Sequence, residues 1–237
     1  MSDLNLRLLS NSTLPGQPYF AWPKPYLGEF FEPIDEILFV PFAGVTITYD
    51  EYTEMLQKAI QEFDVKVIGI HTCENPVEAV QNAKAIAVGG GNTFHLFHEL
   101  HRLNLMSEIQ AACHRGVPYI GWSAGSNTAC PFLHTTNDMP IIQPESFEGL
   151  NLLPFQINVH YTDKTLEGHG GESRDTRLAE YRVLHPNLPL IGLPEGDLIE
   201  VKGNLYNLVG AFPMKVWLPG QKEAMEVAPG IFDPSNW

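Results

Sequence analysis

Short apolar runs alternate with helical segments through the first half of this chain. The runs lie at 6–9, 37–41, 65–70, 85–88 and 117–122. Apolar residues at helical spacing lie between them, at 49–63, 76–83, 94–103 and 106–114. Such alternation is typical of a parallel sheet whose crossover helices cover both faces. The sequence therefore predicts an α/β fold of three layers, with a mostly parallel sheet between helices.

The second half of the chain is less regular. We expect a helix at 172–184 and short strands at 152–158, 190–193, 198–201 and 214–218. Antiparallel strands that complete an α/β sheet would fit this pattern. The chain has 237 residues, with no internal repeat and no linker. We therefore expect a single domain over residues 1–237.

Residues 17–34 are rich in proline and aromatic residues. Prolines at 18, 23, 25 and 33 argue against a regular helix there. We expect an ordered or semi-ordered loop, because its aromatic side chains need a surface on which to pack.

Composition limits the classes of partner. Lys and Arg number 14 against 28 Asp and Glu, a net charge of −14, which repels nucleic-acid phosphates and anionic lipid headgroups. The three cysteines, Cys73, Cys113 and Cys130, suggest neither a disulfide framework nor a zinc cluster. The first residues show no basic segment followed by a long apolar stretch, and no run approaches 18 apolar residues, so we expect neither a signal peptide nor a transmembrane helix. We expect a cytoplasmic protein that binds neither nucleic acid nor membranes.

The sharpest chemical signal is Gly-Trp-Ser-Ala-Gly at 121–125, between an expected strand and a helix. A strand-to-helix elbow of this kind projects its central side chain into a crevice, and the glycines avoid collisions with neighbouring elements. Ser123 is thus a candidate nucleophile, and the amide of Ala124 a candidate donor to an oxyanion. The alternative is an ordinary tight turn.

A second glycine cluster, Gly-Gly-Gly-Asn at 89–92, also follows a strand. Its backbone can approach a ligand closely, as a phosphate cradle or as part of an oxyanion hole. No Gly-Lys-Ser/Thr follows, which excludes a Walker A loop. With a candidate nucleophile nearby in the predicted sheet, the oxyanion interpretation is favoured.

A serine nucleophile needs a base and an acid that orients it. Among nine histidines, His160 ends an apolar strand and is preferred over His169, which lies in a glycine-rich loop. Glu195 follows the strand at 190–193, and Asp138 is its rival for the acid. Either carboxylate could instead cap a turn.

Arg174 and Arg177 lie three residues apart at the start of a predicted helix, so they share a face. Together they could hold a carboxylate through bidentate hydrogen bonds. The alternative is that they form ion pairs with neighbouring acids on the chain, Glu172, Asp175 and Glu180.

These motifs together resemble peptidase E, the aspartyl dipeptidase family of serine peptidases. The similar segments run in order at 9–16, 40–46, 88–94, 120–126, 135–141, 156–158, 168–174 and 191–196. The resemblance implies a fold like that of class I glutamine amidotransferases, with serine in place of their cysteine nucleophile. Residues 17–34 show the least family pattern.

The resemblance also implies roles for individual residues. Ser123 would be the nucleophile, His160 its base and Glu195 the orienting acid, with Asp138 as the alternative charge-relay acid. The amides of Gly91 and Ala124 would form the oxyanion hole. The chain order of serine, histidine and glutamate differs from that of α/β-hydrolases, which argues against a lipase or esterase.

The activity implied is cleavage of dipeptides with an N-terminal aspartate through an aspartyl-enzyme, without metal or cofactor. Arg174 would bind the aspartate side chain, with Arg177 and His169 as further substrate contacts. The partner expected is the small peptide substrate, and the chain itself would be a monomer or homodimer. Two alternatives stay open: a cyanophycinase-like peptidase that cleaves β-linked Asp-Arg, and a non-catalytic small-molecule-binding module on the same fold.

Overall fold

The computed structural model describes residues 4–164 and 170–237. Within them, the main sheet has the strand order β12-β9-β8-β1-β5-β4-β2-β3. In chain order its strands are β1 (Asn5–Leu9), β2 (Glu36–Val40), β3 (Lys66–Gly69), β4 (Ile86–Val88), β5 (Tyr119–Trp122), β8 (Leu198–Lys202), β9 (Leu205–Val209) and β12 (Gly230–Phe232). Strands β1 to β5 pair in parallel, and β8, β9 and β12 extend the sheet antiparallel. The predicted parallel sheet is confirmed.

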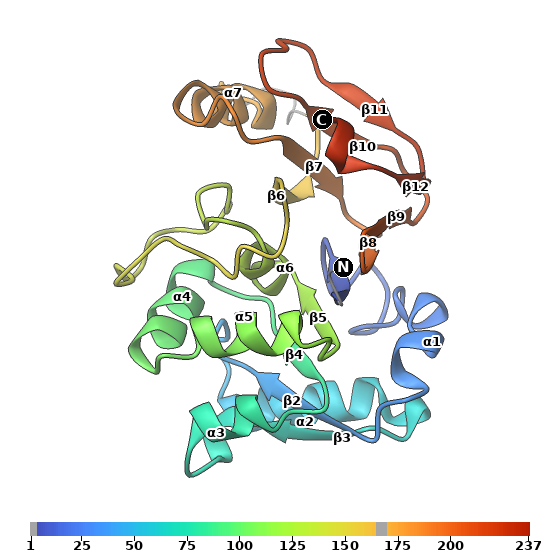
Figure 1. Cartoon of the computed structure of the whole chain (residues 1–237), viewed down its shortest axis with the longest axis vertical. Coiled ribbons are helices and arrows are strands. Elements are labelled where there is room, and N and C mark those ends of the chain that lie inside the picture. The colour runs from blue at the N-terminus through green and yellow to red at the C-terminus, as the bar shows by residue number, and fades with distance from the viewer. Residues whose placement is uncertain (1–3, 165–169) are drawn as a thin grey trace.

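Helices cover both faces of this sheet (Figure 1). They are α1 (Gly28–Phe31), α2 (Tyr49–Ala59), α3 (Pro76–Gln81), α4 (Thr93–Arg102), α5 (Met106–His114), α6 (Ala124–Ala129) and α7 (Arg174–Leu184). The alternation of side chains along β2 decides the faces. Leu38 and Val40 join the core beneath α3, α4 and α5, whereas Ile37 and Phe39 join the core beneath α1 and α2. No described helix is long and apolar enough to cross a membrane.

A second sheet lies at the upper end of the molecule in Figure 1, beside α7. Its order is β11-β10-β7-β6, with β6 (Gln156–Tyr161), β7 (Leu190–Pro194), β10 (Met214–Trp217) and β11 (Met225–Val227). A small core of Tyr161, Leu178, Leu190 and Trp217 joins this sheet to α7. The sequence predicted several of these strands but not that they leave the main sheet. The strand expected at 152–158 is also displaced, because it begins at Gln156 and continues to Tyr161.

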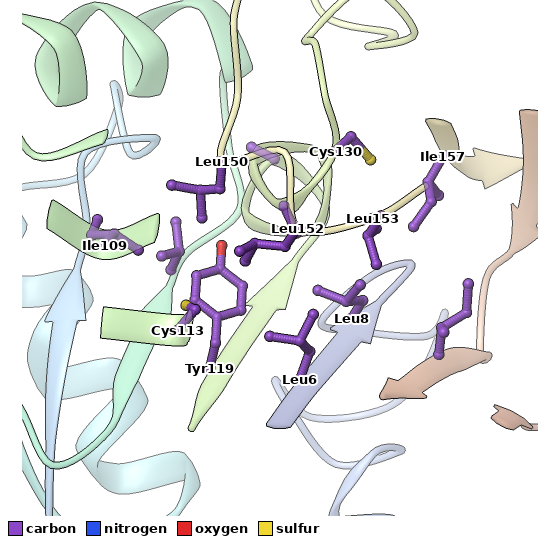
Figure 2. Packing of buried hydrophobic residues seen from close by; sticks show 14 of the residues in the cluster. Leu6, Leu8, Ile109, Cys113, Tyr119, Cys130, Leu150, Leu152, Leu153 and Ile157 are labelled. Atoms are coloured by element: carbon purple, nitrogen blue, oxygen red, sulfur yellow. The ribbon is translucent and has the colours of Figure 1, made fainter. Parts of the chain in front are cut away.

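An irregular segment between α6 and β6 completes one face of the main sheet. Figure 2 shows its residues Leu150, Leu152 and Leu153 near the strand side chains Leu6, Leu8 and Tyr119. All six are buried and belong to one core cluster. Residues 135–141 within this segment lie near the carboxyl end of β4, because Asp138 accepts from the amide of Thr93 and the side chain of Asn92 donates to the oxygen of Met139.

The proline-rich segment at 17–34 is ordered and covers the opposite face. Phe20 is fully buried, and its ring meets Trp122 edge-on with a 5.0 Å centroid separation. Trp22 donates its indole N–H to the backbone oxygen of Asn11. The expectation of no regular helix is wrong for one turn, α1, which lies between Pro25 and Pro33 and buries Phe30.

One buried acid joins the two sheets where the chain passes from β7 to β8. Asp197 is fully buried, and its Oδ1 accepts hydrogen bonds from the amides of Ala211 and Phe212 at 2.9 and 3.4 Å. Burial raises the pKa of Asp197 to about 6, from an ordinary value of 3.8, although both amides act in the opposite direction. The folded protein therefore retains a proton that the unfolded chain releases between those two values.

This pKa predicts a loss of stability as pH rises. The contribution of Asp197 is fully present below pH 3.8 and lost as pH rises through about 6. Asp197→Asn removes the titration, so the free energy of unfolding of the variant, relative to that of wild type, should rise by about 2 kcal/mol between pH 4.5 and 7.5. Urea unfolding at both pH values measures this difference. The exposed Glu223→Gln is the control, and a gap independent of pH would contradict the prediction.

Candidate active site

Ser123 occupies a strained elbow between β5 and α6. Its backbone angles, φ 52° and ψ −113°, lie in a region that residues with side chains rarely adopt. A Cβ atom on Gly121 would lie 2.5 Å from the carbonyl of Gly125, and one on Gly125 would lie 2.1 Å from the oxygen of Val88. The two glycines therefore let β4, β5 and α6 approach one another closely, and the elbow forms where they meet.

Ser123, His160 and Glu195 form one chain of hydrogen bonds. The Nε2 atom of His160 lies 2.8 Å from Oγ of Ser123, and its Nδ1 lies 2.6 Å from Oε1 of Glu195. His160 lies in an irregularity of β6, with φ 52°, and Glu195 follows β7. About a third of the His160 side chain and nearly half of the Glu195 side chain is exposed. A substrate can therefore reach the serine and the imidazole.

Asp138 occupies a different position. Its Oδ2 accepts hydrogen bonds from the backbone amide of Thr93 at 2.8 Å and from its hydroxyl at 2.6 Å. The hydroxyl of Thr136 donates to the same oxygen at 3.0 Å. Among the described contacts, none joins Asp138 to His160. Of the two candidate acids, the structure thus brings Glu195 to the imidazole, and it brings Asp138 to the beginning of α4.

The glycine loop at 89–92 lies beside Ser123. A Cβ atom on Gly90 would lie 3.1 Å from Cβ of Ser123. Gly91 has φ +139°, and a Cβ there would lie 2.1 Å from the oxygen of Ala43, so only glycine fits. The Tyr52 hydroxyl donates to the oxygen of Gly90 at 2.9 Å. The loop is therefore fixed by Ala43 on one side and by Tyr52 on the other. Asp138 binds the first residue of α4, the helix that follows the loop.

Three residues that the sequence did not predict for the site lie at the end of β1: Leu9 ends the strand, and Ser10 and Asn11 follow it. The oxygen of Leu9 accepts the amide of Ser123 at 3.1 Å. Oγ of Ser10 accepts the amide of His160 at 2.8 Å and donates to the oxygen of Leu193. The next residue, Asn11, accepts the amide of Gly196 at 2.9 Å, directly after Glu195. The sequence did contain a signal for these residues, because the buried strand β1 is followed by two polar residues. In a parallel sheet, the carboxyl end of β1 lies at the same edge as that of β5.

Arg174 begins α7 and is half-buried. Its guanidinium donates to the side-chain oxygen of Asn137, which also accepts from the side-chain amide of Asn158. Asn137 in turn donates to the backbone oxygen of Val159, the residue before His160. These contacts place Arg174 at the edge of the sheet that carries the imidazole.

Neither Arg174 nor Arg177 has a carboxylate within 4 Å among the described residues. Asp175, one of the acids considered for this pairing, instead accepts from the hydroxyl of Tyr161 and pairs with Lys215. Burial, and then the charge of Arg177, lower the pKa of Arg174. The alternative of ion pairs with neighbouring acids is therefore wrong. A bound anion would stabilise the charged guanidinium of Arg174. His169 lies outside the described residues.

No group of three or more His, Cys, Asp or Glu in the described ranges is arranged to hold a metal ion. The groups gathered at Ser123 are a hydroxyl, an imidazole, a carboxylate and backbone amides. A hydroxyl hydrogen-bonded to an imidazole that is itself oriented by a carboxylate is the arrangement of a serine hydrolase.

Comparison with known proteins agrees with this geometry. The model of Peptidase family S51 matches residues 6–209. The chain belongs to peptidase family S51. It is 47% identical over 206 residues to a peptidase E of Nostoc sp., covering 86% of this chain and 85% of that protein. It is 45% identical over 219 residues to a peptidase E of Shigella flexneri, covering 92% and 96%.

Solved structures share the fold. A Listeria monocytogenes protein assigned to peptidase E matches with a TM-score of 0.67 and 24% identity, covering 88% of this chain and 98% of its own. A peptidase from an acI-B1 Actinobacterium matches with a TM-score of 0.68 and 17% identity, covering 98% and 97%. These matches are consistent with the expected glutamine amidotransferase-like fold. As a member of family S51, the chain is a serine peptidase, a hydrolase that acts on peptide bonds.

The hydrogen bond from His160 to Ser10 predicts an effect of Ser10 on peptidase activity. Ser10→Ala removes the acceptor that fixes the backbone of the imidazole residue, which has a positive φ. We expect kcat to fall about 10- to 100-fold with a smaller change in KM, because a small displacement of a reacting group is costly.

Steady-state kinetics on a cleavable dipeptide measures both constants. Ser107→Ala, an exposed serine on α5, is the matched control. A kcat for Ser10→Ala equal to that of the control would show that Ser10 does not position His160.

Proposed function

We propose that this serine peptidase hydrolyses dipeptides with an N-terminal aspartate through an aspartyl-enzyme intermediate. The observation that carries the proposal is the half-buried Arg174, without a carboxylate partner among the described residues, near the end of β6 that bears His160. A guanidinium at such a place can bind the aspartate side chain through two parallel hydrogen bonds. The peptidase E relatives support the same assignment. We propose Arg177 and His169 as further substrate contacts.

In the proposed mechanism, Ser123 attacks the carbonyl carbon of the aspartyl residue while His160 removes the hydroxyl proton. Glu195 holds the imidazole in the tautomer that can accept this proton and stabilises the imidazolium that forms. The amides of Gly91 and Ala124 donate to the oxyanion, and each such donor is typically worth about 3 kcal/mol.

Collapse of the tetrahedral intermediate breaks the peptide bond. His160 gives its proton to the leaving amine, and the second amino acid departs. Water, activated by the same imidazole, then attacks the aspartyl ester and regenerates Ser123. Asp138 supports this cycle through α4 and the glycine loop, since its carboxylate binds Thr93.

The first test is cleavage of a panel of dipeptides by wild type and Ser123→Ala. We expect release of free amino acid from Asp-Leu but little from Glu-Leu, Leu-Leu, β-Asp-Leu or β-Asp-Arg. Ser123→Ala should lower kcat about 10⁴- to 10⁶-fold, because without the nucleophile only binding and the oxyanion donors remain. The melting temperature of the variant checks that its fold is intact.

Each outcome of the panel separates one hypothesis from another. Cleavage confined to β-Asp-Arg would replace the proposal with the cyanophycinase-like activity. Full activity in Ser123→Ala would remove Ser123 as the nucleophile.

Arg174→Leu tests the recognition of aspartate. Loss of one charge-assisted pair in a partly desolvated site costs about 2–5 kcal/mol, so kcat/KM for Asp-Leu should fall at least 30-fold. The control is Arg182→Leu on the same helix, whose guanidinium donates to backbone oxygens of Gln221 and Lys222. Equal kcat/KM values for Asp-Leu in the two variants would show that Arg174 has only a structural role.

A further inference from the structure

A cavity of about 650 Å³ opens beside the glycine loop. The turn between β2 and α2 forms one side, and Tyr19 of the proline-rich segment forms another. Ile141, three residues after Asp138, and Met55 of α2 also line it. The cavity therefore combines four segments that are distant in the sequence and meet at the carboxyl edge of the sheet.

The cavity shares a wall with the proposed oxyanion site. Gly90 and Gly91 line it, and Gly90 packs so closely on Ser123 that a Cβ would lie 3.1 Å from the serine Cβ. Tyr52 also lines it, and its hydroxyl is fixed by the oxygen of Gly90 and the indole N–H of Trp122. A substrate whose carbonyl carbon is bonded to Ser123 would thus place one of its side chains next to this cavity.

The chemistry of the lining decides which part of a substrate fits. The larger side chains are apolar or aromatic, and none of the described lining residues carries a charge: the main ones are Tyr19, Val45, Ile47, Tyr52, Met55 and Ile141. Burial of an unpaired carboxylate or ammonium group costs several kcal/mol, so this lining disfavours a charged side chain. The aspartate carboxylate has its cation elsewhere, at Arg174. An uncharged apolar side chain is the complementary ligand.

We propose that this cavity binds the side chain of the second residue of the dipeptide and selects apolar residues there. The inference rests on the proposed aspartyl dipeptidase function and adds a preference for Asp-Leu, Asp-Met or Asp-Phe. It also gives the segment at 17–34 a role in specificity, because this segment supplies Tyr19 to the rim.

The experiment compares kcat/KM for Asp-Leu, Asp-Ser and Asp-Lys. Wild type should favour Asp-Leu over Asp-Ser at least about 10-fold, the discrimination that a small difference in apolar volume gives. Ile47→Asn places an amide in the cavity and should lower that ratio several-fold. Met55→Gln is the second variant, in case the first does not fold. Leu205→Asn, a half-exposed leucine on β9 outside the cavity, should leave the ratio as in wild type.

The outcomes distinguish this inference from the function on which it rests. Equal kcat/KM values for the three peptides in wild type, or a preference for Asp-Lys, would overturn the apolar cavity while aspartyl dipeptidase activity stands. A parallel fall for all three peptides in both cavity variants would also overturn it, because a merely structural role acts on every substrate alike. No cleavage of any Asp-X peptide by wild type would overturn the proposed function and this inference together.

Discussion

The close approach of β4, β5 and α6 is the constraint on which the site depends. Gly121 and Gly125 permit it, because neither has a side chain to collide with the opposing backbone. The strained conformation of Ser123 persists since its surroundings are fixed: its amide binds the oxygen of Leu9, and the hydroxyl of Ser126 binds the same oxygen at 2.6 Å. The position of the serine hydroxyl is thus set by the packing of the sheet rather than by a mobile loop.

The end of β1 extends this order to the other two groups. Leu9, Ser10 and Asn11 contact, in turn, the backbone of Ser123, the backbone of His160 and the turn that carries Glu195. These three consecutive residues therefore fix the positions of Ser123, His160 and Glu195 relative to one another. Asp138 acts similarly on the opposite side, because it fixes the first residue of α4 behind the glycine loop.

Local patterns explain what the sequence could predict. The elbow at Ser123 and the glycines at 89–91 are recognisable since strand, glycine and helix signals lie within a few residues of each other. Other features depend on pairings between residues far apart in the chain: the contacts of Arg174, the position of Asp138, and the roles of Ser10 and Asn11. The bond from Gly196 to Asn11 spans 185 residues, and the bond from Thr93 to Asp138 spans 45.

Long-range pairing also explains the second sheet. The strand pattern of β6 and β7 is readable, but their separation from the main sheet depends on which strands become neighbours. In the same way, prolines at 25 and 33 bound the short helix α1 without preventing it, because packing of Phe30 and Phe31 on the sheet stabilises one turn.

The relay also links the two sheets mechanically. Ser123 follows a strand of the main sheet, whereas His160 lies on β6 and Glu195 follows β7, both strands of the smaller sheet. The distance between Nε2 of His160 and Oγ of Ser123 therefore depends on the relative position of the two sheets. A displacement of about 1 Å between the two sheets would misplace the imidazole against the serine and cost about 100-fold in rate. The contact between the two sheets is thus part of the catalytic geometry, although it lies outside the substrate site.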